Sequence, residues 1–137
     1  MEENNCIVSY YDSGKIKSKS WYENNEYHKN DGPAYVMYSE SGNIIREYWY
    51  DNGKFHRDDG PALILYYLDT SPYVLHWYNY GKKYRKDGPV IIEYHPNGTI
   101  SKEAWCGNEH DWIEYDKNGT IIKSKYVSLV PQQALSI

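Results

Sequence analysis

Apolar side chains recur along the chain in columns whose members are 28 residues apart. Two of these columns lie two residues from each other, and residues two apart on a β-strand point to the same face. The first column is Val8, Val36, Ile64 and Ile92, and the second is Tyr10, Tyr38, Tyr66 and Tyr94. The pattern predicts one strand with an apolar face in every period.

A second strand is predicted in each period around a column of tryptophans. These are Trp21, Trp49, Trp77 and Trp105, again at steps of 28 residues, and a tyrosine follows each of the first three. The other positions of this strand vary between Lys, Arg, Glu, Ser and Ile, as expected of a solvated face. In all, the pattern predicts about ten short strands that form five hairpins.

Turn residues separate the predicted strands. The first turn of a period is placed at Gly14, Gly42, Gly98 and Gly119, and the second at Asn24-Asn25, Asn52-Gly53 and Tyr80-Gly81. Asn-Gly between β-rich segments is a strong hairpin signal, because both central positions of the tight turn favour φ > 0. The third period has Asp69-Thr70-Ser71-Pro72 where a glycine turn is expected. We expect a different loop geometry there, since Pro72 cannot donate a ladder hydrogen bond.

A longer stretch, WYDNGKFHRDDGPA, spans Trp49 to Ala62 and occurs in related form at Trp21 to Ala34 and at Trp77 to Val90. A fixed period of this length is the signature of a repeat architecture. We therefore predict an all-β fold, an elongated antiparallel meander of about five hairpins that forms a single domain over residues 1–137. Its units are 7–34, 35–62, 63–90 and 91–127, the fourth shortened by seven residues, and residues 128–137 form a C-terminal cap.

The Asp-Gly-Pro triplet of each unit is interpreted as a structural corner. The residues involved are Asp31, Gly32, Pro33, Asp59, Gly60, Pro61, Asp87, Gly88 and Pro89. The residue before proline is pushed toward extended geometry, and glycine tolerates conformations closed to other residues, so we expect a positive φ at Gly60. A basic residue stands two positions before each aspartate, at Lys29, Arg57 and Arg85, which predicts a local ion pair.

No metal, cofactor or catalytic site is expected. The histidine column near the corner, His28 and His56, is interrupted by Tyr84, so the repeat does not preserve a set of metal ligands. None of the common catalytic or nucleotide-binding motifs occurs in the sequence, and we expect no enzymatic activity.

Composition indicates which partners and which cellular compartment to expect for the protein. The chain has 17 tyrosines and five tryptophans but one phenylalanine, and aromatic enrichment favours strands. A net charge of −4 gives no electrostatic reason to expect nucleic acid or an anionic membrane as a partner. Cys6 and Cys106 belong to no CxxC pattern and are interpreted as free thiols. With no secretion signal and no apolar run near the ~20 residues of a membrane span, we expect a soluble, intracellular protein without membrane insertion.

The two faces of the predicted sheet separate a core from a candidate binding surface. The apolar columns are predicted to be the core: Val36, Tyr38, Ile64, Tyr66, Ile92 and Tyr94. Each tryptophan and the tyrosine after it point to opposite faces, so one of the two rings should be partly exposed. We predict that Tyr22, Tyr50 and Tyr78 are exposed and bind a protein partner. The alternative is that these rings cover a neighbouring strand.

The glycine-turn hairpins, with WYDNGK, WYNYGK, NGTI and SGNI between aromatic strands, resemble MORN-type repeats in the variant found in YwqK-like proteins. The longer WYxNGKxHRxDGPA form is similar to repeats of bacterial, phage and large DNA virus proteins, which implies a cytoplasmic setting or, for a virus, the host cytoplasm or the virion. The resemblance covers roughly residues 9–127. It implies an elongated sheet of successive hairpins that acts in protein–protein contact.

Three functions are consistent with these features. The first is a protein-binding or scaffold module that presents one face of the sheet. The second, implied by the label of YwqK-like proteins, is an antitoxin or immunity protein that neutralises a partner toxin. The third is a glycan-binding aromatic array, which the missing secretion signal disfavours. The identity of the partner and a homodimer are left open.

Overall fold

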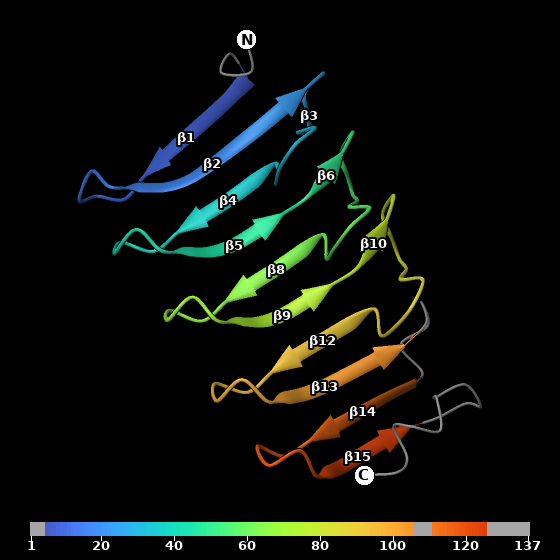
Figure 1. The fold of residues 1–137 in the computed structure, drawn as a ribbon. Coiled ribbons are helices and arrows are strands. Elements are labelled where there is room, and N and C mark those ends of the chain that lie inside the picture. The colour runs from blue at the N-terminus through green and yellow to red at the C-terminus, as the bar shows by residue number, and fades with distance from the viewer. Residues whose placement is uncertain (1–4, 106–110, 126–137) are drawn as a thin grey trace.

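The computed structural model describes residues 5–105 and 111–125, and all of its elements are β-strands (Figure 1). Ten of them follow one another in a single antiparallel meander, so the predicted series of five hairpins is confirmed. These ten are β1 (Cys6–Tyr10), β2 (Ile16–Glu23), β4 (Tyr35–Tyr38), β5 (Ile44–Tyr48), β8 (Leu63–Tyr66), β9 (Pro72–His76), β12 (Ile91–Tyr94), β13 (Ile100–Trp105), β14 (Asp111–Tyr115) and β15 (Ile121–Lys125). The other five are β3 (Glu26–Tyr27), β6 (Tyr50–Asp51), β7 (Lys54–Phe55), β10 (Tyr78–Asn79) and β11 (Lys82–Lys83).

Strand register places the predicted valine and isoleucine column on one face of the sheet. Val36 lies opposite Lys19 of β2 and Glu47 of β5. Ile64 lies opposite Glu47 of β5 and Leu75 of β9, which is the same offset one unit later. The 28-residue period of the sequence is therefore a repeat of strand pairing, two strands for each unit.

The buried residues of this face form a narrow strip, while Ile91 and Ala104, which pair with each other, are buried on the opposite face. Val36, Ile64 and Ile92 expose 5%, 7% and 9% of their surface, and Ala34 and Ala62 expose none. These small and β-branched residues lie in the middle of the first strands or directly before them. The predicted core is confirmed for the valine and isoleucine column.

The tyrosine column lies at the margin of that strip. Tyr38, Tyr66 and Tyr94 are only half-buried, so this part of the predicted core is a border and not an interior. The hydroxyl of Tyr66 donates to Oε2 of Glu47 at 2.9 Å. Burial, followed by this hydrogen bond, raises the pKa of Tyr66. Tyr66 therefore combines a half-buried ring with a hydrogen-bonded hydroxyl.

The first turns close by a three-residue loop in which a type I turn is followed by a left-handed residue. In the second unit the amide of Ser39 donates to the carbonyl of Asn43 at 2.8 Å, and the amide of Gly42 donates back to Ser39 at 2.9 Å. Gly42 takes the left-handed position of this loop, with φ = 90°. The ladder shifts register beyond the loop, because Tyr38 pairs with Ile44 and Met37 with Arg46, so Ile45 is the extra residue of a bulge.

The loop at Thr70 has the same geometry, which corrects the expectation of a different one. Tyr67 N donates to Ser71 O at 2.8 Å, Thr70 N donates to Tyr67 O at 3.0 Å, and Thr70 takes the left-handed position with φ = 72°. Loop length and the flanking ladder fix this conformation even though no glycine is present. Hydrogen bonds from the Ser71 hydroxyl and amide to the carboxylate hold the loop and lower the pKa of Asp69.

The fourth unit passes directly from β13 to β14, where Trp105 pairs with Asp111. Five residues separate these two positions, against twelve between Trp21 and Ala34, so the predicted deletion of seven residues joins two neighbouring strands directly. Cys106, the rest of the shortened connection and the predicted cap at 128–137 lie outside the described residues. Cys6 is a free thiol, as predicted.

Replacing Thr70 with glycine should stabilise the protein by about 0.5–1 kcal/mol. A β-branched residue at positive φ is strained, and glycine relieves that strain at a smaller cost in unfolded-state entropy. Chemical denaturation measures the change. Thr120→Gly is the control, because Thr120 stands one residue after the left-handed Gly119 of its own loop and should gain nothing. A Thr70→Gly variant less stable than the parent would contradict the assignment of strain.

Candidate functional site

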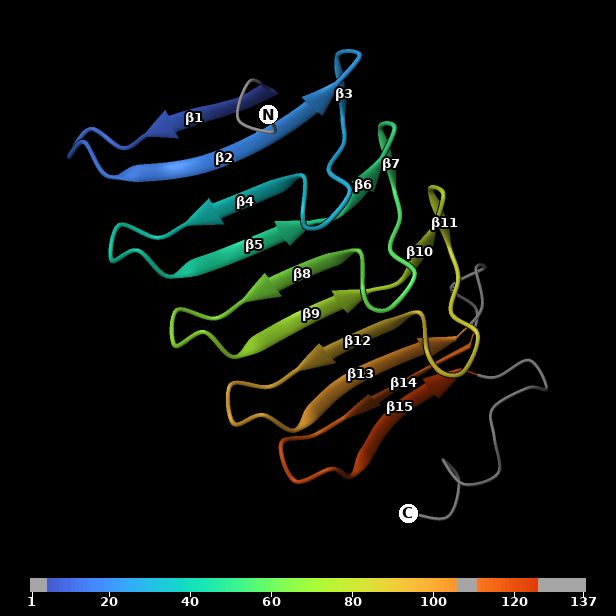
Figure 2. The same cartoon turned by 45° about the horizontal axis from the view of Figure 1, so that its top comes forward.

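Three small hairpins project from the same end of the sheet, one for each of the first three units (Figure 2). We refer to them as ear 1 (residues 22–27), ear 2 (50–55) and ear 3 (78–83). Each has a two-residue turn in which both central residues have positive φ, for example Asn52 at 46° and Gly53 at 77°. The tight turn that Asn-Gly predicted is thus confirmed, and ear 3 forms it with Tyr80 at φ = 45°.

The tryptophan before each ear is where pairing switches from the main sheet to the ear. The amide of Trp49 donates to the carbonyl of Ala62 in the next strand at 2.7 Å, while its carbonyl accepts from the amide of His56 at 3.0 Å. Trp21 and Trp77 have the same two bonds in their own units. The segments that return from the ears, residues 28–34, 56–62 and 84–90, are called the corner loops below.

The ears are joined to one another by a continuous stack of five aromatic rings. Successive ring centroids are 4.7, 5.0, 4.4 and 5.0 Å apart, and neighbouring rings are inclined by 19–28°. The rings are, in order, Tyr22, Tyr27, Tyr50, Phe55 and Tyr78. Backbone bonds reinforce the stack, since Gly53 N donates to Tyr27 O at 2.9 Å and Gly81 N to Phe55 O at 2.8 Å. The ears therefore form a fixed row.

The three tyrosines predicted to bind a partner are members of this stack. Tyr50 lies between Tyr27 and Phe55, so both faces of its ring are covered, and Tyr22 and Tyr78 are also only half-buried. The arrangement matches the alternative in which these rings cover their neighbours. A hydrogen bond with Tyr22, followed by burial, raises the pKa of Tyr27 to about 12. For Tyr50 only the ring edge and the hydroxyl end remain for contact with a partner, whereas Tyr22 and Tyr78, at the two ends of the stack, each have one stacking neighbour.

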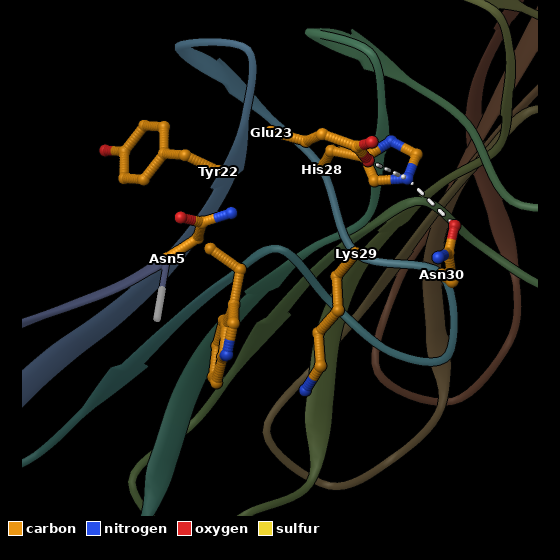
Figure 3. Close-up of a pocket in the computed structure, with 7 residues that line it drawn as sticks. Asn5, Tyr22, Glu23, His28, Lys29 and Asn30 are labelled. Carbon is orange, nitrogen blue, oxygen red and sulfur yellow. Dashed lines mark hydrogen bonds and ion pairs between the residues drawn. The ribbon is translucent and has the colours of Figure 1, made fainter. Parts of the chain in front are cut away.

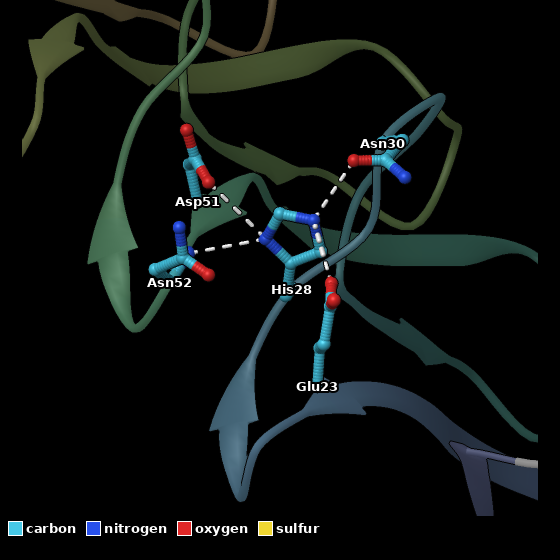
Figure 4. Close-up of polar contacts among 5 residues, drawn as sticks. All are labelled: Glu23, His28, Asn30, Asp51 and Asn52. Atoms are coloured by element: carbon cyan, nitrogen blue, oxygen red, sulfur yellow. Dashed lines mark hydrogen bonds and ion pairs between the residues drawn. The ribbon is translucent and has the colours of Figure 1, made fainter.

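Histidines fix each ear to the next one. Nδ1 of His28 accepts the backbone amide of Asn52 in ear 2 at 3.2 Å and lies 3.2 Å from the carboxylate of Asp51 (Figure 4). Its Nε2 is 2.8 Å from Oδ1 of Asn30 and 3.2 Å from the carboxylate of Glu23. Because Nδ1 accepts a hydrogen bond, the proton of the neutral ring is on Nε2.

His56 repeats this arrangement one unit later. Its Nδ1 accepts the amide of Tyr80 at 3.2 Å, its Nε2 lies 3.0 Å from Asp58, and its ring stacks on Tyr80 at 3.8 Å. The histidine column is thus used to position the ears. Among the described residues, no group of three or more His, Cys, Asp and Glu side chains is placed to hold a metal ion.

A cation covers the tryptophan ring before each of the three ears. Lys29 Nζ is 4.0 Å from the ring centroid of Trp21, and Arg57 Cζ is 3.8 Å from that of Trp49. The third unit places Arg85 on Trp77 in the same way, at 3.9 Å. Such contacts stabilise by about 0.5–2 kcal/mol. The eight-residue interval from tryptophan to cation in the repeat therefore encodes a cation–π contact.

The glycine of the triplet makes room for that cation. A Cβ on Gly60 would come within 2.9 Å of the Arg57 guanidinium carbon, so the guanidinium lies between the indole of Trp49 and the backbone of Gly60. The same group donates to the Pro61 carbonyl at 3.3 Å and pairs with Asp59 at 3.0 Å, which confirms the predicted ion pair in this unit. Gly60 itself does not have a positive φ, which corrects the expectation for it. At Gly60 close approach, and not a left-handed backbone, requires the glycine, whereas Gly88 of the third unit combines close approach to Arg85 with φ = 139°.

Three equivalent clefts open beside the ears, with volumes of about 290, 460 and 470 Å³. Each is lined by the tryptophan, the tyrosine and the next residue of its unit, together with the first residue of its corner loop. Cleft 1 contains Trp21, Tyr22, Glu23 and His28 (Figure 3); cleft 2 contains Trp49, Tyr50, Asp51 and His56; cleft 3 contains Trp77, Tyr78, Asn79 and Tyr84. The corner loop of the preceding unit forms the other wall of clefts 2 and 3.

The clefts differ in charge although their shape repeats. Cleft 2 is lined by four carboxylates, Asp31, Asp51, Asp58 and Asp59, against the two cations Lys29 and Arg57. In clefts 1 and 3 the carboxylates and cations are equal in number. Asp58 and Asp59 expose 93% and 84% of their side chains. Cleft 2 therefore presents an accessible excess of negative charge.

The repeated residues that line the clefts could be predicted from the sequence, but their arrangement into clefts could not. Trp21, Trp49 and Trp77 and the Asp-Gly-Pro corners were predicted to be structural, and they form the walls. The missed residues are those that vary at equivalent positions, such as Glu23, Asp51 and Asn79. These residues could have been found from the recurring triplet of Trp, Tyr and a polar residue, which places one polar side chain beside each pair of rings.

Comparison with protein-family models, with curated proteins and with solved structures finds no match. The resemblance to MORN-type repeats therefore stays a prediction based on the sequence motifs. Within residues 5–105 and 111–125 no helix is long and apolar enough to cross a membrane.

Gly60→Ala should destabilise the protein by more than about 1 kcal/mol, because the added methyl group displaces Arg57 from Trp49. Gly32→Ala is the matched comparison and should cost less, since its Cβ would meet the flexible end of Lys29 at 3.4 Å. Urea denaturation gives both values. In an Arg57→Ala background the cost of Gly60→Ala should fall; an unchanged cost would exclude the clash as its cause.

Tyr50→Ala should lower the free energy of unfolding by about 2 kcal/mol, because it opens the aromatic stack between ear 1 and ear 2. Tyr10→Ala is the control, since Tyr10 is 61% exposed and belongs to β1. Thermal and urea unfolding of the two variants measure the difference. Equal stability of the two variants would mean that the stack contributes little to the fold.

Proposed function

We propose that this protein is a non-enzymatic binding module that receives an extended segment of a partner protein along the row of three clefts. The observation that carries the proposal is that the same cleft is built three times beside ears held in a fixed row. A ligand that follows the row can make the same kind of contact in each unit. A scaffold or an antitoxin would be a particular case of such a module.

Rigidity of the row supports this role. Each ear is tied to the next by a backbone hydrogen bond, by a histidine contact and by ring stacking, for example Gly53 N to Tyr27 O, Asn52 N to His28 and Tyr50 on Tyr27. A surface that is already ordered loses little conformational entropy when a partner binds. The clefts are therefore better placed to bind than a set of independent loops would be.

The chemistry of the clefts suits a protein partner. Tyrosine and tryptophan, which are enriched where proteins contact one another, line each cleft beside carboxylates and amides. A glycan-binding array is less well supported, because a sugar ring stacks on an open aromatic face. Arg57 covers one face of Trp49, and both faces of Tyr50 are covered by other rings.

Site-specific photo-crosslinking in an extract of the native cell tests the proposal. A benzoyl-phenylalanine at Tyr84, which lines cleft 3 and is 55% exposed, should give a discrete protein adduct that mass spectrometry identifies. The same group at Tyr10, which is 61% exposed and lies outside the three clefts, should give at least fivefold less.

An adduct with a toxin whose activity falls on binding would identify an antitoxin, and an adduct of twice the chain mass would identify a second copy as the partner. No adduct at Tyr84, or equal adducts at Tyr84 and Tyr10, would contradict the proposal.

A further inference from the structure

We infer that the segment bound by the clefts is a polyproline II helix with one basic residue at its centre, in the pattern Pro-x-x-Arg-x-x-Pro or Pro-x-x-Lys-x-x-Pro. The inference rests on the proposed function and specifies the ligand of that site. Three observations carry it: the spacing of the clefts, their volume and the excess of carboxylates in the middle one.

The spacing follows from the aromatic stack. Each unit adds two ring-to-ring steps, 4.7 and 5.0 Å from Tyr22 to Tyr50 and 4.4 and 5.0 Å from Tyr50 to Tyr78. Equivalent points of neighbouring clefts are therefore about 9–10 Å apart, as expected for two strands at ~4.8 Å each. A polyproline II helix has three residues per turn and rises ~3.1 Å per residue, so every third side chain returns to the same side after ~9.3 Å.

Other peptide conformations fit the row less well. In a β-strand the side chains on one side repeat after ~6.6 Å, which does not match the clefts. An α-helix returns to the same side after seven residues or ~10.5 Å, but it is ~10–12 Å wide. Clefts of about 290–470 Å³ that are bounded by ears and corner loops admit single side chains and a thin backbone. The row therefore favours polyproline II geometry.

The rings of the clefts suit proline. Proline-rich segments dock between aromatic side chains and lose little entropy, because their conformation is already formed. Each cleft is lined by a tryptophan and a tyrosine, for example Trp77 and Tyr78 in cleft 3. Clefts 1 and 3, in which carboxylates and cations are equal in number, should receive the two prolines.

The charge of cleft 2 selects the central residue. Its two cations are engaged on indole rings, Lys29 on Trp21 and Arg57 on Trp49. Asp58 contacts Nε2 of His56 at 3.0 Å, yet 93% of its side chain is exposed, so its carboxylate is accessible to a ligand. A guanidinium or ammonium group that enters between the two corner loops would approach Asp31 and Asp58 from opposite walls. Such charge-assisted contacts favour a basic side chain over a neutral one.

Titration of the full chain with fluorescein-labelled Pro-Pro-Ala-Arg-Pro-Ala-Pro tests the inference by fluorescence anisotropy. Binding in the micromolar range is expected. A peptide with one extra alanine on each side of the arginine, which breaks the three-residue spacing, should bind at least tenfold more weakly. Replacing the arginine with glutamate should weaken binding by a similar factor.

Charge reversal in the protein makes the test specific. Asp58→Lys should bind the arginine peptide at least tenfold more weakly and the glutamate peptide more tightly than the parent does. Asp12→Lys is the matched control, because Asp12 is also exposed but belongs to the turn between β1 and β2 and lies outside the three clefts. Its affinities should equal those of the parent within twofold.

Three results would overturn the inference: no binding of the arginine peptide, equal affinity for the peptide with altered spacing, or binding of an oligosaccharide such as chitohexaose in its place. A protein adduct at Tyr84 without binding of the arginine peptide would leave the proposed function standing and reject this ligand. The absence of any adduct at Tyr84 would reject the proposed function itself.

Discussion

The contact between a cation, an indole ring and a glycine is the interaction on which the rest of this fold depends. A single sheet must cover its apolar face with its own chain, because the described strands have no second layer packed on them (Figure 1, Figure 2). The corner loop meets this requirement when it returns across the tryptophan with Arg57 on Trp49 and Gly60 on Arg57. Burial of Ala62 beside the same tryptophan is then possible without any other element.

Stability of the array is consequently shared between neighbouring units. Tyr27 of ear 1 stacks on Tyr50 of ear 2, and His28 of the first corner loop accepts a hydrogen bond from the turn of ear 2. An ear on its own would have two strands of two residues, which is too little for an independent hairpin. Repeat proteins with such nearest-neighbour contacts gain stability with each added unit. Each ear is therefore held in its conformation by the neighbouring ears and corner loops.

The meander was predictable because two periodicities of the sequence agree: the alternation of residues along a strand and the repeat of 28 residues between strands. Alternation along Val36 and Tyr38 defines a strand, and repetition at Ile64 and Tyr66 defines its neighbour on the same face. The turn at Asn52-Gly53 was predictable, because asparagine and glycine both tolerate the positive φ that a tight two-residue turn requires. The loop at Thr70 was not, because the flanking ladder imposes a left-handed residue there whatever the side chain.

Side-chain stacking was beyond the same reasoning. Tyr22 and Tyr27 are five residues apart, and only the tight turn of the ear brings their rings together. Whether Tyr50 faces solvent or a neighbouring ring depends on how far each ear bends from the sheet, which is decided at the tryptophan where pairing switches. Alternation along a strand assigns a side chain to a face but does not say what covers that face.

Differences in sequence among the three units would allow the row of clefts to distinguish one partner segment from another. The tryptophan and the tyrosine that line each cleft are the same in all three units, so the clefts repeat in shape. Residues at their openings do change, from Glu23 to Asp51 to Asn79 in the ears and from His56 to Tyr84 in the corner loops. Clefts of equal shape and spacing therefore differ in charge. A row of this kind can distinguish partner segments that differ in side chain at successive turns. Each cleft contacts one position of the bound segment, and the equal spacing of the clefts fixes which position that is.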